Sequence, residues 1–210
     1  SPEKLFKFYP EVFEKANVLR VEVPFMMGSE NMGFKEWQKI ARVVSRLLND
    51  SNIKGVIITH GTDTLHYTAA ALSFFLKNLN KPVVLTYSQR SGDRASSDAS
   101  LNLYCATLAA ISDMAEVVIV GHASSNDDYC CAFRGSKVRK LHSSRRDAFK
   151  PVNMGPIAKI TKDSFIPLMP YKTRTKNKTE LDISFEEKVA LIKFYPGQDP
   201  DILEYYRKKG

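Results

Sequence analysis

Strand-like and helix-like segments alternate along the first 121 residues, and this alternation constrains the fold more than any other feature. Short apolar runs, typical of strands buried on both faces, are followed by segments with apolar residues at helical spacing. The expected strands are Val18–Val23, Gly55–Ile58, Pro82–Thr86 and Glu116–Gly121, and the expected helices are Gly33–Leu48, Thr64–Leu76 and Asp98–Met114, the last capped by Ser97 or Asp98. This order predicts an α/β fold with right-handed crossovers and a parallel sheet covered by helices on both faces.

The pattern changes after Gly121, where the expected strands become shorter. They lie near Tyr129–Phe133, Lys137–Leu141, Pro156–Ile160 and Phe165–Leu168. The polar stretch Tyr171–Asp182 is typical of a linker or an exposed hairpin. A buried strand at Val189–Phe194 and a helix at Asp199–Lys208 then suggest the opening βα unit of a second, smaller α/β domain. The predicted division is therefore a first domain over 1–170, a linker over 171–187 and the beginning of a second domain over 188–210.

Composition and charge narrow the classes of protein. The 210 residues are 43% hydrophobic and 26% charged, which suits a globular chain with a sizeable core. No apolar run reaches the roughly 20 residues of a membrane span, and Ser1–Lys4 has no signal-peptide character, so we expect no membrane association. The net charge of +8 favours an anionic partner such as RNA, or equally a surface of solvated lysines.

The cysteines and histidines favour a metal-free, intracellular protein. There are three cysteines, Cys105, Cys130 and Cys131, an odd number without CxxC spacing, so we expect reduced thiols and a cytoplasmic location. Of the adjacent pair on the strand expected there, one side chain should point inward and the other outward. The four histidines are scattered without metal-ligand spacing, and His60 is expected to satisfy local backbone groups.

The stretch Gly55–Leu65 (GVIITHGTDTL) carries the clearest chemistry. A buried strand ends there, a glycine turn follows and a helix begins, which is where parallel α/β sheets bind ligands. Free N–H groups at the helix start favour a substrate carboxylate, and Asp63 can accept hydrogen bonds from a substrate ammonium group. Thr62 offers a hydroxyl, which is a weak nucleophile until a base activates it. The alternative, which this chemistry alone favours, is that Thr62, Asp63 and Thr64 only cap the helix.

The pattern GxxxxHGTDT followed by an aliphatic residue resembles the second signature of the type I asparaginases, whose N-terminal domain is a Rossmann-like parallel α/β domain. The resemblance implies that Thr62 holds a water molecule or acts in acyl transfer. It implies that Asp63 binds the substrate amino group and orients a lysine that keeps the hydroxyl reactive, and it also places Gly61 in the substrate site. The lysine is best matched by Lys140, nine residues before Phe149 in the element Asp147–Ala148–Phe149, with Lys137 as the competitor.

Two further stretches resemble the same family. In Met27–Met32 (MGSENM), the resemblance implies that Ser29 and Glu30 grip the α-carboxylate and amino group of the substrate, whereas from the residues alone the stretch is a plain helix-entry loop. The third match, Leu85–Ser91, continues to Leu101–Leu103. Relatives usually have small residues where Tyr87 and Ser88 stand, so Tyr87 is expected to narrow this wall of the pocket.

Two other stretches, His66–Phe74 and the basic Lys137–Phe149, resemble the asparaginase-like D-subunit family of archaeal Glu-tRNA(Gln) amidotransferases. The resemblance implies a homodimer that hydrolyses glutamine or asparagine and passes ammonia to the amidotransferase E subunit. The E subunit would use ATP and Mg to amidate the glutamate of Glu-tRNA(Gln), with no cofactor and no metal in the glutamine-hydrolysing subunit. The cations expected near that partner or the tRNA, or alternatively on an exposed basic loop, are Arg134, Lys137, Arg139, Lys140, Arg145, Arg146 and Lys150.

Type I asparaginases also have an early TGGT-type motif, whose threonine is the first nucleophile, followed by a mobile loop with a tyrosine. The present sequence contains no Gly-Gly pair. The resemblance therefore predicts an internal piece without the first strand and nucleophile loop and without most of the second domain. We expect this polypeptide alone to lack amidase activity; ammonia release from glutamine that Thr62→Ala abolishes would contradict this. The competing hypotheses are a stand-alone L-asparaginase and a non-catalytic RNA-binding scaffold.

Overall fold

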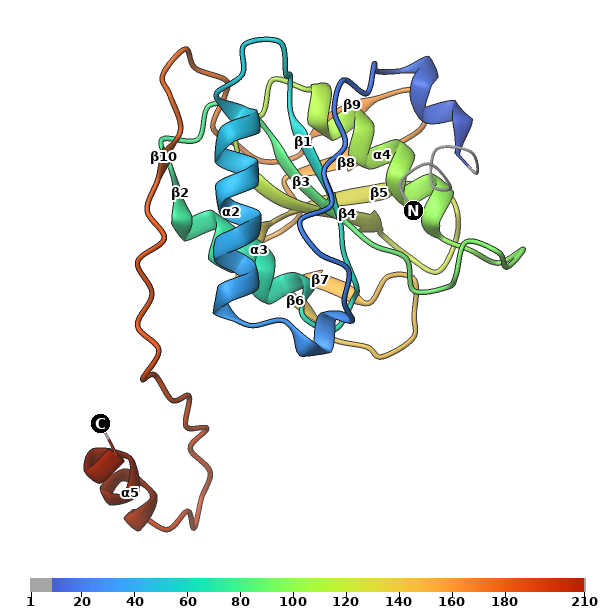
Figure 1. Cartoon of the computed structure of the whole chain (residues 1–210). Helices are drawn as coiled ribbons and strands as arrows, with labels where there is room; N and C mark the ends of the chain where they lie inside the picture. The colour runs from blue at the N-terminus through green and yellow to red at the C-terminus, as the bar shows by residue number, and fades with distance from the viewer. Residues whose placement is uncertain (1–8, 210) are drawn as a thin grey trace.

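A computed structural model describes residues 9–209; residues 1–8, which the sequence assigns to the first domain, and 210 lie outside the described part. At its centre is a six-stranded sheet with the order β1-β3-β4-β5-β8-β9 (Figure 1). Its strands are β1 (Val56–Thr59), β3 (Val83–Thr86), β4 (Val117–His122), β5 (Cys130–Arg134), β8 (Ala158–Ile160) and β9 (Phe165–Pro167). The first three are parallel, as the strand–helix alternation predicts, whereas β5, β8 and β9 each run antiparallel to the strand before them in this order.

Helices cover both faces of this sheet, which confirms the predicted α/β architecture. Helices α2 (Phe34–Leu48) and α3 (Leu65–Phe75) pack on one face, and α4 (Ala99–Ile111) packs on the other. Alternate residues of the central strands enter the two cores, because successive side chains of a strand point to opposite faces. In β4, for example, Val117 and Ile119 join the α2/α3 core, whereas Val118 and Val120 join the α4 core.

Two expectations about the early strands are wrong. Val18–Val23 forms no strand; it is irregular, and in Figure 1 it runs across the domain without joining the sheet. Its apolar side chains stay exposed, 63% for Leu19 and 50% for Val23, because no neighbouring strand in the described chain pairs with it. Strand β1 is also not buried on both faces. It lies at the edge of the sheet, where Ile57 and Ile58 are only half-buried.

The adjacent cysteines of β5 differ from expectation in one respect. Both are buried, Cys130 in the α4 core and Cys131 in the α2/α3 core, because helices cover both faces of the sheet. All three cysteines are free thiols. Burial raises the pKa of Cys131 to about 11, so that this thiol stays protonated and is a poor nucleophile at neutral pH.

Two short antiparallel pairs and three short 3-10 helices complete the described part of the domain. Strand β6 (Val138–Lys140) pairs with β7 (Phe149–Pro151), and β2 (Leu76–Lys77) pairs with β10 (Glu180–Leu181). The 3-10 helices are η1 (Pro10–Glu14), η2 (Ser29–Asn31) and η3 (Gly135–Lys137). The sequence indicates β6 but neither its partner nor β2 and β10, which are too short for a detectable alternation of side chains.

The segment expected to be a linker or exposed hairpin packs against the domain over much of its length. The Arg174 guanidinium donates to the carbonyls of Ala110 (3.1 Å) and Ser112 (2.6 Å) at the end of α4, and to that of Lys54 just before β1. Further along, the buried Thr179 hydroxyl donates to the side chain of Asn80 at 2.9 Å. These contacts tie the segment to the first domain, and its part in dividing the chain into domains stays a prediction.

The last part of the chain leaves the domain (Figure 1). The expected strand Val189–Phe194 is extended but irregular, and its apolar side chains are exposed, 83% for Leu191 and 84% for Phe194. The strand prediction is wrong because an apolar run becomes a strand only beside a second strand, and the described chain provides none. The helix that follows, α5 (Asp201–Lys209), forms as expected but has no buried residue.

Within residues 9–209, none of the helices has both the length and the apolar character needed to cross a bilayer.

Arg174 allows a test of how much the segment Tyr171–Asp182 contributes to the stability of the domain. We expect Arg174→Ala to lower the free energy of unfolding by about 2 kcal/mol, because the carbonyls of Ala110, Ser112 and Lys54 lose a charged donor. The measurement is urea unfolding followed by circular dichroism. Arg207→Ala is the control, since Arg207 is exposed and pairs only with Glu204 on α5. Equal midpoints for the two variants would contradict the role given to Arg174.

Candidate active site

The turn between β1 and α3 forms the centre of the candidate site. It follows the carboxyl end of β1 and carries Thr62, Asp63 and Thr64 directly before the first residue of α3. Polar groups of the η2 segment hold this turn from the other side. The Asp63 N–H donates to the Ser29 hydroxyl at 3.2 Å, and the Thr64 hydroxyl donates to the Ser29 carbonyl at 2.7 Å. Two of the sequence motifs therefore meet at Ser29.

Gly61 makes this contact possible. A Cβ atom placed on Gly61 would lie 2.6 Å from the Ser29 Oγ and 2.8 Å from its Cβ, closer than nonbonded atoms approach. Ser29 itself is only 4% exposed, so it has little room to move away. A glycine at this position thus allows the η2 segment to approach the turn.

Lys140 completes the group of predicted site residues. It is the last residue of β6, and its Nζ donates to the Thr62 hydroxyl and to Asp63 Oδ1, both at 2.8 Å. Its side chain is 13% exposed, whereas that of Asp63 is 58% exposed, so the amine lies under the carboxylate and the turn. The structure thereby distinguishes the two candidate lysines, because Lys140 and not Lys137 reaches Thr62.

The competing interpretation, in which these residues only cap α3, is wrong. Thr64 occupies the N-cap position but makes no side-chain capping hydrogen bond. The Thr64 hydroxyl donates instead to the Ser29 carbonyl, and the side chains of Thr62 and Asp63 accept hydrogen bonds from Lys140. The start of α3 therefore lacks the side-chain capping hydrogen bond that usually contributes about 1 kcal/mol. Its polar side chains bond to Ser29 and Lys140 instead.

His60, just before the turn, supports the backbone. Its Nδ1 lies 2.6 Å from the Gly61 carbonyl, which can only accept, so Nδ1 is the donor. Its Nε2 lies 2.8 Å from the hydroxyl of the buried Thr68. Burial lowers the pKa of His60 despite the opposing effect of the Gly61 carbonyl. The ring is therefore neutral at neutral pH, with Nε2 accepting from Thr68, which agrees with the structural role expected from the sequence.

Two further residues singled out by the sequence, Glu30 and Tyr87, differ in burial, because Glu30 is exposed and Tyr87 is buried. Glu30 lies beside Ser29 in η2, is exposed, and turns its carboxylate back over Gly28. Tyr87, which is expected to narrow one wall of the pocket, is packed in the core, and its effect on the pocket stays a prediction. It is 4% exposed and belongs to the α2/α3 core, with its ring centroid 4.5 Å from that of Phe149. Its bulk is used for packing because β3 directs this side chain inward.

The basic stretch is largely paired within the chain. Five of its seven cations form ion pairs: Arg134 with Glu116, Lys140 with Asp63, Arg145 and Lys150 with Asp147, and Arg146 with Asp127. Burial alone would raise the pKa of Asp147, but Arg145 and Lys150 outweigh it and the pKa lies below its usual value. The side chain of Arg145 nevertheless stays 54% exposed, and contact of these cations with a partner or with tRNA stays a prediction.

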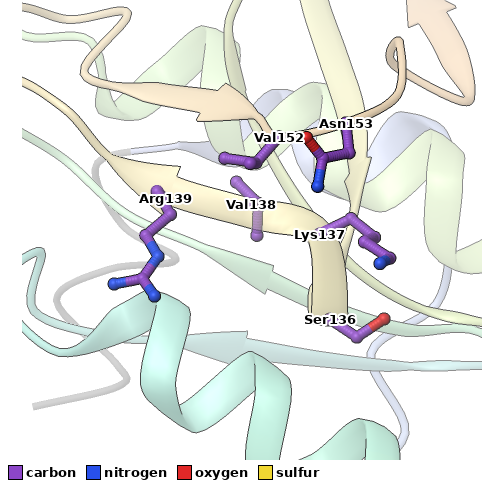
Figure 2. A pocket seen from close by; sticks show the side chains of 6 residues that line it. All are labelled: Ser136, Lys137, Val138, Arg139, Val152 and Asn153. Carbon is purple, nitrogen blue, oxygen red and sulfur yellow. The ribbon is translucent and has the colours of Figure 1, made fainter. Parts of the chain in front are cut away.

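A small pocket lies on the outer side of the β6–β7 hairpin. Its lining consists of Ser136, Lys137, Val138, Arg139, Val152 and Asn153. Figure 2 shows that the side chains of Lys137 and Arg139 point in different directions, so their charges do not converge on one bound group. Because Thr62, Asp63 and Lys140 are absent from this lining, the pocket is separate from the candidate site.

The arrangement at Thr62 suits proton transfer to and from a hydroxyl. An amine 2.8 Å from the Thr62 oxygen can take its proton when neutral, and a carboxylate at the same distance from the amine orients it. Groups of three or more His, Cys, Asp or Glu side chains able to hold a metal ion do not occur between residues 9 and 209.

Comparison with known proteins agrees with this geometry. Residues 1–169 match the family described as Asparaginase, N-terminal. The chain belongs to the asparaginase family. Within it, the chain is 50% identical over 212 residues to the D subunit of Glutamyl-tRNA(Gln) amidotransferase from Pyrococcus furiosus and 49% identical over 213 residues to that from Archaeoglobus fulgidus. All of this chain is matched but only 48% and 50% of those relatives, so it spans about half their length.

Solved asparaginase structures share the fold. The thermostable L-asparaginase from Thermococcus kodakarensis superposes with a TM-score of 0.84 at 25% identity, covering 99% of this chain and 60% of that one. L-asparaginase I from Vibrio cholerae gives a TM-score of 0.80 at 28% identity, covering 97% and 60%. This asparaginase-family fold therefore extends over nearly the whole chain.

Sequence reasoning missed the second layer of residues around the site. Thr64 binds Ser29, Thr68 binds His60, and the Tyr87 hydroxyl donates to the Arg146 carbonyl at 2.8 Å. The contacts of Thr64 with Ser29 and of Tyr87 with Arg146 join residues 35 and 59 positions apart, and no local pattern in the sequence indicates them. Thr64 had a local signal, but that signal pointed to helix capping.

The approach of Gly61 to Ser29 is testable. We expect Gly61→Ala to destabilise the folded chain by about 1–3 kcal/mol, because the added methyl group overlaps the Ser29 side chain. Thermal unfolding would measure this change. Gly155→Ala serves as the control, since its Cβ would meet only the Met169 sulfur at 3.7 Å. The same unfolding temperature for both variants would show that η2 is free to shift and that the contact is unimportant.

Proposed function

We propose that this chain is part of a glutamine-hydrolysing subunit of a tRNA-dependent amidotransferase. The observation that carries the proposal is the contact of the Lys140 amine with Thr62 and Asp63 within an asparaginase-family fold. The identity of 50% to an amidotransferase D subunit over the whole chain favours that enzyme. Glutamine, or asparagine, would be hydrolysed to supply ammonia for the conversion of Glu-tRNA(Gln) to Gln-tRNA(Gln).

The residues of the site would have distinct roles in this reaction. Lys140, when neutral, would accept the proton of the Thr62 hydroxyl as that oxygen holds a water molecule or takes part in acyl transfer. Asp63 would keep the amine in place and receive the substrate ammonium group on its exposed side. Ser29, Glu30 and Gly61 would form the wall that contacts the α-carboxylate and amino group. The proposed nucleophile of the first step is a threonine outside this chain.

The proposed partners are those of an amidotransferase D subunit, because relatives with that name match the whole of this chain. The protein would form a homodimer and bind the amidotransferase E subunit, which would use ATP and Mg to activate Glu-tRNA(Gln) in the cytoplasm. No cofactor is proposed for the glutamine-hydrolysing subunit. Direct contact of the basic stretch with tRNA is not part of the proposal, because five of its seven cations are paired internally.

A stand-alone L-asparaginase is the second candidate, favoured by the superposition on two solved L-asparaginases. Ammonia release from glutamine by the natural full-length protein, with and without the E subunit and Glu-tRNA(Gln), separates the two. Strong stimulation by both partners would support the amidotransferase. Full activity without them would favour the asparaginase, and no activity under any condition would leave a non-catalytic scaffold.

Substitution of Thr62 tests the site itself. In the full-length protein with its partner, we expect Thr62→Ala to lower kcat for glutamine hydrolysis at least about a hundredfold, since the proton-transfer pair with Lys140 is lost. Lys140→Met should have a similar effect. The matched control is Thr175→Ala, which removes an exposed threonine of the tail. Retention of kcat in Thr62→Ala would refute the assignment of this site while leaving the fold intact.

A further inference from the structure

The position of Lys140 depends on a loop that follows it directly. Lys140 is the last residue of β6 and lies opposite Phe149, the first residue of β7, so residues 141–148 close the hairpin. Within the loop, the Leu141 N–H donates to the Ala148 carbonyl at 2.8 Å. The hairpin has only three residue pairs, and two-stranded ribbons of this length are unstable alone. Contacts from elsewhere must therefore hold the Lys140 end of it in place.

A closed ring of five hydrogen-bonded residues supplies such contacts, and we call it the Arg146 ring. The Tyr87 hydroxyl donates to the Arg146 carbonyl at 2.8 Å, and Arg146 Nη1 donates to Asp127 at 2.8 Å. Asp127 Oδ1 is hydrogen-bonded to His122 Nε2 at 2.9 Å, and His122 Nδ1 is hydrogen-bonded to Asn102 Oδ1 at 2.6 Å. The Asn102 amide closes the ring by donating to the Tyr87 carbonyl at 3.0 Å.

The ring joins the hairpin loop to the centre of the domain. Tyr87 follows β3, Asn102 is in α4, His122 ends β4, and Asp127 is in the β4–β5 loop. Three of these residues, Tyr87, Asn102 and His122, are at most 4% exposed, so the ring is anchored in the core. Only Arg146 belongs to the loop, and it is held through both its main chain and its side chain.

The Tyr87 ring itself also supports the hairpin. It packs on Phe149, the residue opposite Lys140, with 4.5 Å between ring centroids. On its other side it lies against Gly121, where a Cβ would come within 2.3 Å of the tyrosine ring. Tyr87 thus reaches the hairpin at two points, through its ring at Phe149 and through its hydroxyl at Arg146.

We propose that Arg146 is a positioning residue that holds the β6–β7 hairpin in place and so keeps the Lys140 amine within reach of Thr62. The guanidinium makes two further bonds, to the Ser96 carbonyl at 2.9 Å and to the Ser125 carbonyl at 3.4 Å. With its side chain only 13% exposed, its charge faces the domain and not the solvent. The basic loop therefore acts, at this position, as part of the internal support of the site.

Amide hydrogen exchange on the 210-residue chain tests the structural half of this proposal. We expect Arg146→Gln to accelerate exchange of the Leu141 and Ala148 amides about tenfold or more, because loss of the side-chain bonds allows the loop to open locally. The Ile119 amide in the central strand β4 reports on global unfolding and should change far less. If Arg146→Gln does not fold, Arg146→Lys replaces it, since a single ammonium group cannot serve three separated acceptors at once.

Arg94→Gln is the matched control for this measurement. Arg94 is an exposed arginine of the neighbouring β3–α4 loop, so its substitution removes the same charge without touching the Arg146 ring. We expect wild-type exchange at Leu141 and Ala148 in this variant. Unchanged exchange in Arg146→Gln, or equal acceleration in Arg94→Gln, would overturn the proposal.

The functional half rests on the proposed glutamine hydrolysis and needs the full-length protein with its partner. We expect Arg146→Gln to lower kcat about tenfold while KM stays within about twofold, because Lys140 is misplaced and the substrate-contacting residues are not. Faster exchange without loss of kcat would overturn the positioning of Lys140. If the wild-type protein hydrolyses neither glutamine nor asparagine, the proposed function fails, but the exchange result still decides whether Arg146 holds the hairpin.

Discussion

Burial of the central strands on both faces is the constraint on which the rest of the structure depends. Every residue of β3 and β4 is buried, so these strands require a helical layer on each side. Helices α2 and α3 provide one layer and α4 the other. The strand–helix crossovers then bring the polar turns after β1, β3 and β4 to a common edge of the sheet. Thr62, Tyr87 and His122 all lie on or beside that edge because of this arrangement.

The lysine that contacts Thr62 comes from outside the alternating strand–helix part of the chain. Lys140 lies 78 residues after Thr62, on a short hairpin. Ion pairs of exposed groups typically contribute only about 0–1 kcal/mol, so the pair of Lys140 with the half-exposed Asp63 cannot hold the hairpin alone. Buried groups contribute more to holding the hairpin in place. These are the Tyr87 ring, which packs on Phe149, and the side chains of His122 and Asn102. Placement of the amine is thereby coupled to the core of the domain.

The folded structure pairs several cations of the basic stretch with carboxylates that lie far from them in the sequence. A run of cations in Arg134–Lys150 suggests attraction to an anionic partner, yet three of them, Arg134, Lys140 and Arg146, pair with carboxylates from separate segments. Glu116 is in the turn before β4, Asp127 is in the β4–β5 loop, and Asp63 follows β1. Since these acids are distant in sequence, the run of cations alone does not indicate these ion pairs.

Much of the fold and the core of the site could be predicted from local patterns. Helical spacing in Gly33–Leu48 located α2 within one residue, and the HGTDT motif placed Thr62 and Asp63 at the end of a strand. Local patterns failed where the outcome depends on a distant neighbour. Val18–Val23 and Val189–Phe194 have the composition of strands but no strand beside them in the described chain. Helix capping by Thr64 was favoured for the same reason, because Ser29 is not visible from the local sequence.

By itself, the sequence determined the alternation of strands and helices, the polar turn after β1 and the set of residues able to carry out hydroxyl chemistry. Only the tertiary structure decided that Lys140 and not Lys137 reaches Thr62, that Gly61 must lack a side chain because Ser29 lies against it, and that Arg146 faces inward. The physical reason is that periodicity and turn chemistry act over a few residues. Hydrogen bonds and close packing instead act between atoms a few ångströms apart, whatever their separation along the chain.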